Sequence, residues 1–169
     1  DGVHTVIFLA SMFANGIGIG QESIITALIL VQFVAVPATL IWSYVANSYG
    51  DKTVIYITIF IYIGVIIHSM SLSNAFEFYI MAALVGSVQG GIQASSRSLF
   101  AKIITKEKSG EFFGFYNTFG RAGSVLGPLL VNVFLVLFND LKIALIPLII
   151  LFILGAIILK FVDENNEIV

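Results

Sequence analysis

The sequence has no cysteine and few charged side chains. Among its 169 residues, 11% are Asp, Glu, Lys or Arg, whereas a typical soluble domain carries about 25%. The absence of cysteine excludes disulfides, thiolate metal sites and catalytic thiols. The shortage of charge, at an apolar content of 59%, excludes an ordinary soluble domain and a disordered chain. A net charge of -2 also argues against a nucleic-acid partner, which requires a basic surface.

Long apolar runs make up most of the chain. A membrane-spanning helix takes about 20 apolar residues, so with short loops the chain has room for about six. The breaks between the runs predict helices over residues 2–19, 23–48, 53–72, 74–99, 111–137 and 141–161. Such runs are too long for β-strands, and a membrane barrel would alternate polar and apolar residues. We therefore expect a single all-α integral membrane bundle over residues 1–169, with the lipid bilayer as a partner.

The cations in the short loops predict an orientation. Cytoplasmic loops of membrane proteins carry an excess of Lys and Arg. Six cations fall on one side, namely Lys52, Arg97, Lys102, Lys106, Lys108 and Lys160. On the other side, only Lys142 lies in a loop. We therefore expect both ends of the chain to be cytoplasmic, including the loop at 100–111 and the tail at 163–169.

Polar side chains within the fifth predicted helix are candidates for solute binding. A charged group inside a bilayer is costly, so it should face a partner or a wet cavity. Arg121 lies about 10 residues into this helix, about 15 Å from its start and close to the midplane. Asn117 lies one turn earlier on the same face. The alternative is that Arg121 snorkels along Gly120 and Gly123 or pairs with a helix carbonyl.

A second polar stripe lies in the fourth predicted helix. Its members are spaced by four residues, and they are Gln89, Gln93 and Arg97. The amides of this stripe would either form a cavity wall facing a polar solute or make hydrogen bonds between helices without a ligand. The same two interpretations apply to Gln32 in the second predicted helix. Gly86 and Gly90 form a small-residue face on the same helix as the stripe, which predicts a close helix contact.

The first predicted helix, 2–19, is short for a membrane span, and the chain begins with Asp1 rather than Met. We expect a chain cut from something longer, in which this helix extends upstream. Asp1 would then lie inside the membrane, where it would bind a proton or pair with Arg121.

Motifs for catalysis and cofactor binding are missing from the sequence. No His, Cys or carboxylate cluster has metal-ligand spacing. There is no phosphate-binding GK[ST] loop, and no Ser-His-Asp set is recognisable. We therefore expect no enzyme activity, no cofactor and no metal.

One long stretch carries a family resemblance. The run QGGIQASSRSLFAKIITKEKSGEFFGFYNTFG, followed by GSVLGPLL, resembles the C-terminal half of a major facilitator superfamily transporter. More narrowly, it is similar to the autophagy-related vacuolar effluxer branch and its bacterial relatives, and DGVHTVIFLAS and VQFVAVPATL fit the same branch. The resemblance implies the last six helices of a twelve-helix fold, with the N-terminal half of the transporter as partner. Pro37 and Pro128, placed alike in the second and fifth helices, favour two inverted three-helix repeats.

The resemblance also implies a function. We expect secondary active transport of a small polar solute, such as an amino acid, by alternating access. Gln89, Gln93, Asn117 and Arg121 would face the cavity, and Arg121 would attract a carboxylate. The membrane would be a bacterial plasma membrane rather than a vacuolar one, although the charge pattern fits both. The competing hypothesis is a membrane scaffold whose polar residues are buried against each other.

One motif departs from the superfamily pattern Gly-x-x-x-Asp-Arg-x-Gly-x-Lys. The stretch SYVANSYGDK has Ser43, Asn47 and Ser48 at three of these positions and keeps Gly50 and Lys52. Asn47 cannot form a charge pair, so we expect the ionic latch of this turn to be absent or neutralised. State switching would then depend on Arg97 and on the loop at 102–111.

Overall fold

The structure is a computed structural model that describes residues 12, 14–16 and 18–162. In this part of the chain the elements are helices, which confirms the all-α prediction. The long helices are α2 (Gln21–Tyr49), α3 (Asp51–Ser69), α4 (Ala75–Ile103), α5 (Ser109–Phe138) and α7 (Ile146–Lys160). Two short elements, η1 (Lys106–Lys108) and α6 (Leu141–Ala144), connect them. Most of the predicted helix at 2–19 lies outside the described residues, and within it Met12 and residues 14–16 are helical.

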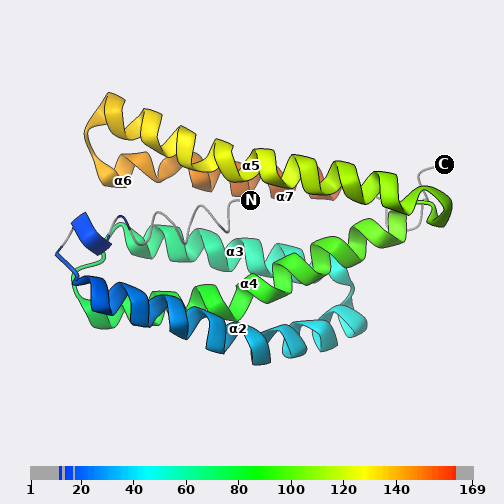
Figure 1. Cartoon of the computed structure of the whole chain (residues 1–169), viewed down its shortest axis with the longest axis horizontal. Helices are drawn as coiled ribbons and strands as arrows, with labels where there is room; N and C mark the ends of the chain where they lie inside the picture. Colours follow the sequence, from blue (N-terminus) through cyan, green and yellow to red (C-terminus); the bar gives the residue numbers. More distant parts are fainter. Residues whose placement is uncertain (1–11, 13, 17, 163–169) are drawn as a thin grey trace.

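Five stretches of the described residues are long and apolar enough to cross a bilayer, the last of them running from Lys142 to Lys160. In Figure 1, α2, α3 and α4 lie together on one side of the molecule, and α5 runs along α7 on the other. α3 has 19 residues and is about 28 Å long, close to the ~30 Å of a hydrocarbon core. α2, α4 and α5 each have 29 or 30 residues and exceed that thickness.

Glycines on α4 bring it into close contact with α2. A Cβ built on Gly86 would lie 2.6 Å from the backbone oxygen of Val31, and one on Gly90 would lie 3.3 Å from the backbone oxygen of Ala35. Trp42 Nε1 donates a hydrogen bond of 2.6 Å to the Ser87 carbonyl oxygen. The predicted small-residue face is therefore confirmed, and α2 is the helix that packs against it.

The core lies among α3, α4 and α7. Tyr62 of α3, Met81 of α4 and Leu148 of α7 are among the largest fully buried side chains. The Tyr62 ring stacks on Phe152 with centroids 5.3 Å apart, which joins α3 to α7. α2 and α5 contribute less to the core, since only 17% and 11% of their apolar spans are buried, against 44% for α3. Most of the surface of α2 and α5 is therefore available to lipid or to further protein.

Glycine and asparagine residues shape the connections between the helices. α2 and α3 are separated only by Gly50, whose φ of +89° lies in a region that side chains disfavour. At the start of α4, Asn74 accepts a hydrogen bond from the Glu77 N–H, and Glu77 accepts one from the Ser73 N–H. Glu77 thus bonds the residue before the N-cap Asn74 rather than the N-cap N–H itself, which is a variant of the capping box. α5 ends at Asn139, which adopts the left-handed conformation with φ +49°.

The boundaries differ from the prediction by a few residues, most visibly in two places. The helix predicted at 141–161 is present as one apolar span from Lys142 to Lys160, but Leu145 interrupts it and separates α6 from α7. Pro147 lies in the first turn of α7, where its missing N–H is tolerated, and it could not continue the ladder from α6. The connection predicted at 100–111 is shorter in the structure, because α4 continues to Ile103 and α5 begins at Ser109.

Candidate functional site

The polar stripe of α4 lies about midway along the helix. The side-chain oxygen Gln89 Oε1 is buried and has no hydrogen-bond partner among the residues that the structure describes. Gln93 is partly exposed and Arg97 is exposed. A buried amide oxygen without a partner carries a desolvation cost of about 1–3 kcal/mol. Gln89 Oε1 is therefore an acceptor suited to a donor group from outside the described chain.

The polar pair of α5 has little cover. Asn117 and Arg121 are both exposed, and the residues of α5 that are buried, Gly127 and Val131, lie in its second half. Among the described residues, no carboxylate lies within ion-pair distance of Arg121. The backbone oxygen of Arg121 accepts a hydrogen bond from Ser124 Oγ. Within the described part of the chain, no carboxylate therefore neutralises the Arg121 guanidinium.

The remaining candidate residues lie on other surfaces. Gln32 is exposed, although its neighbour Val31 is buried against Gly86 of α4. Asn47 is exposed in the last turn of α2. Asp1 lies outside the described residues, so its proposed role in ion coupling stays a prediction.

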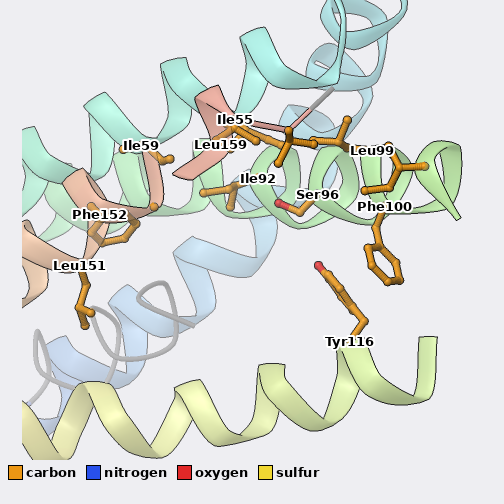
Figure 2. Close-up of a pocket in the computed structure, with 13 residues that line it drawn as sticks. Ile55, Ile59, Ile92, Ser96, Leu99, Phe100, Tyr116, Leu151, Phe152 and Leu159 are labelled. Carbon is orange, nitrogen blue, oxygen red and sulfur yellow. The ribbon is translucent and has the colours of Figure 1, made fainter. Parts of the chain in front are cut away.

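A pocket of about 370 Å³ opens among α3, α4, α5 and α7. Its walls are mostly apolar, and they include Ile55, Ile92, Leu99 and Leu159. Figure 2 shows the Tyr116 ring rising from α5 with its hydroxyl directed toward the α4 wall, where Ser96 and Phe100 lie. None of the predicted solute-binding residues lines this pocket. The structure therefore does not gather the α4 stripe and the α5 pair around one described cavity.

Aromatic rings hold the start of α5 against the end of α4. Phe100 of α4 lies 5.4 Å from Phe113 and 4.8 Å from Tyr116, measured between ring centroids. The first half of α5 has no buried residue, and these ring contacts join it to α4.

An ion pair that the sequence did not reveal lies at the turn between α2 and α3. Lys102 Nζ of α4 lies 2.7 Å from Asp51 Oδ2 of α3, and Ser98 Oγ donates to the same oxygen over 2.8 Å. The Asp51 side chain is only 3% exposed, whereas that of Lys102 is 54% exposed. Asp51 is in the first turn of α3 and Lys102 in the last turn of α4, so each charge is favoured by its own helix dipole.

Lys52, which follows Asp51 in the sequence, contacts the end of α7, whereas Asp51 contacts α4. Its Nζ donates a hydrogen bond to the backbone oxygen of Val162, just beyond the end of α7. The sequence predicts no charge pair at Asn47, but the structure places one at this same turn through Asp51. Three helix ends, those of α3, α4 and α7, are thus joined by two consecutive side chains.

Weak sequence signals for this cluster did exist. An acid directly after a glycine at a helix start and a lysine in a last turn are both visible in the printed sequence. Their pairing was not visible, because they are 51 residues apart and belong to different helices.

The described residues form helices, with five apolar spans and a polar stripe within one of them, and this defines the class, a multi-pass membrane protein. Residues 1–169 match the family model described as "vacuole effluxer Atg22 like", and the chain belongs to this family. It is 42% identical over 167 residues to an uncharacterized MFS-type transporter, YxiO, of Bacillus subtilis. It is 29% identical over 178 residues to the autophagy-related protein 22 of Vanderwaltozyma polyspora.

These relatives are longer than the chain. The aligned region covers 99% of this chain but 39% of the Bacillus protein, and 98% of this chain but 34% of the yeast protein. A shorter match to the autophagy-related protein 22 of Kluyveromyces lactis is 32% identical over 93 residues, which is 55% of this chain and 17% of that protein. The resemblance to this branch of transporters is therefore confirmed for the whole of the chain.

Proposed function

We propose that the chain is part of a carrier that moves a small polar solute, such as an amino acid, across a membrane by alternating access. Membership of the effluxer family and the match to an MFS-type transporter support transport in general. The structural observation that carries the proposal is the Gln89 oxygen, which is buried within the α4 span and has no partner among the described residues. Buried polar groups usually have a partner, and the Tyr62 hydroxyl in the core is another described group without one.

The solute would contact α4 and α5. Gln89 and Gln93 would offer amide groups from α4, and Asn117 would offer one from α5. Arg121 would attract a carboxylate, because its charge has no partner among the described residues and acts more strongly away from bulk water. Gln32 would contribute from α2.

The rest of the transporter would complete this cavity. We expect six helices here and six in an N-terminal half, as two bundles of inverted three-helix repeats. The exposed apolar surfaces of α2 and α5 and the greater length of the relatives support a further half. The cations at the ends of α4 and α7 support a cytoplasmic position for those ends, and the similar Bacillus protein supports a bacterial membrane.

The test compares solutes of different charge in the complete protein as its gene encodes it. Arg121→Gln should reduce the transport of anionic and zwitterionic amino acids about tenfold or more, and that of neutral polar solutes much less. Lys142→Gln removes a cation near one end of the bundle and is the matched control. An equal loss for all solutes would assign Arg121 to folding instead.

A second candidate function is a membrane scaffold. The glycine contact between α2 and α4 and the Trp42–Ser87 hydrogen bond favour a scaffold, because in both the small or polar groups serve helix packing rather than a ligand. In a scaffold, Gln93 would be covered by a partner and closed to water. The accessibility of position 93 therefore separates the two candidates.

A further inference from the structure

We propose that the Tyr62 hydroxyl and the Gln89 side-chain oxygen form one buried polar site at the inner end of the pocket among α3, α4, α5 and α7. The site would take the hydroxyl or primary amide group of a small neutral molecule whose apolar body fills the pocket. It goes beyond the proposed transport function, because it lies inside this bundle and needs no transported solute.

The Tyr62 hydroxyl and Gln89 Oε1 are complementary in their hydrogen bonding. Both atoms are buried without a partner among the described residues, and the first can donate a hydrogen bond whereas the second accepts one. The Tyr62 side chain is fully buried, and Gln89 is partly exposed although its Oε1 is not. Each atom carries a desolvation cost. A ligand group that accepts from Tyr62 and donates to Gln89 offsets both costs at once.

Tyr62 and Gln89 lie at about the same depth in the α3–α4 hairpin. Asp51 of α3 contacts Ser98 and Lys102 of α4, which fixes the register of these two antiparallel helices. Tyr62 lies 11 residues after Asp51, or about 16 Å along α3. Gln89 lies 9 residues before Ser98 and 13 before Lys102, or about 14–20 Å along α4. One small group can therefore reach both side chains.

The walls of the pocket lead to both residues. Ile59 lines the pocket from α3, and Tyr62 is the next position on the same helix face. Ile92 lines it from α4, and Gln89 precedes it on that face by one turn. Phe152 of α7 also lines the pocket and stacks on the Tyr62 ring with centroids 5.3 Å apart. Figure 2 shows Ile59 and Phe152 toward the same end of the pocket.

The walls also define the class of ligand. None of the described residues that line the pocket is charged, so an ionised group would lose its water there without a counter-charge. A volume of about 370 Å³ with mostly apolar walls is typical of small-molecule sites. α5 contributes Tyr116 alone to the described lining, and the first half of α5 has no buried residue. A neutral molecule dissolved in the bilayer can therefore enter beside α5.

The test is photolabelling of the complete protein in membranes, with no solute present. One probe is octanol with a diazirine on its chain, the other is octane with the same group, and mass spectrometry locates the labelled residues. Octanol should label the pocket walls, and excess unlabelled octanol should displace it. Tyr62→Phe and Gln89→Leu should each lower octanol labelling about fivefold and leave octane labelling unchanged. Tyr56→Phe is the matched control and should change neither, because the Tyr56 hydroxyl already donates to the Ala156 carbonyl oxygen.

Equal labelling by octanol and octane that neither substitution alters would overturn the proposal, because the pocket would then be an apolar space open to lipid chains. Labelling that never reaches the pocket walls would overturn it as well. Tyr62→Phe keeps the ring that stacks on Phe152. If it does not accumulate, Ile92→Trp fills the pocket, and octanol labelling that survives this change would contradict the site. A protein that transports nothing would leave the labelling result intact, and loss of the labelling would leave transport untouched.

Discussion

Lys102 and Asp51 are joined by an ion pair of 2.7 Å in which one partner is almost fully buried and the other is half exposed. Helix α3 supplies the acid and α4 the base, so the pair fixes the end of the α3–α4 hairpin. The burial of its two members differs, and the consequences of removing each one should differ in the same way.

Removing the base should destabilise the protein more than neutralising the acid. Lys102→Met leaves the Asp51 carboxylate buried without a counter-charge, whereas Asp51→Asn leaves a lysine that water can solvate. Breaking a fully buried pair costs about 3–5 kcal/mol, and exposure of Lys102 lowers this to about 2 kcal/mol. Thermal unfolding of the complete protein in detergent measures both. Equal losses would show that the burial difference is not what sets the energy.

Gly86 should not tolerate a methyl group. Gly86→Ala would place its Cβ 2.6 Å from the Val31 backbone oxygen, which cannot rotate away, so α2 and α4 must separate. Overpacking of this kind costs about 1–3 kcal/mol, and the melting temperature should fall. Gly155→Ala is the matched control, because its Cβ would meet nothing within 4 Å. If both variants melt alike, the α2–α4 contact is looser than the structure shows.

Trp42→Phe should weaken the same helix contact by a smaller amount. The substitution keeps most of the ring and removes the 2.6 Å hydrogen bond to the Ser87 oxygen. Hydrogen bonds between membrane helices are worth about 0.6 kcal/mol on average, so the loss should be well below that of Gly86→Ala. Ser87→Ala serves as a control that keeps the accepting carbonyl. A loss as large as that of Gly86→Ala would mean that the ring, not the bond, carries the contact.

Much of the fold could be predicted because it depends on long runs of apolar residues. Apolar stretches of about 20 residues specify membrane helices, since the bilayer satisfies no backbone group. The glycine spacing at Gly86 and Gly90 likewise indicated a close contact, although the partner helix became evident only in the structure. Pro147 was a visible break signal, and the long apolar run around it concealed the interruption between α6 and α7.

The site was harder to predict because it is built from contacts between distant residues. The spacing of Gln89, Gln93 and Arg97 defines a helix face, but not what covers that face. The pocket has mostly apolar walls from four helices, and such residues look like ordinary core in a sequence. The sequence does not single out Asp51, because the ion pair that it forms is with Lys102, which is distant in the sequence.

Water accessibility at Gln93 tests the carrier account most directly. Gln93→Cys introduces one thiol into a chain without cysteine, on the polar stripe of α4 and one turn from Gln89. In the complete protein, the account predicts labelling by a water-soluble thiol reagent, slowed by a transported solute and unaffected by a non-transported one. Leu84→Cys, an exposed apolar position on the same helix, should stay unlabelled in the bilayer. A thiol at position 93 that reacts no faster than the one at position 84 would contradict the carrier account and favour the scaffold.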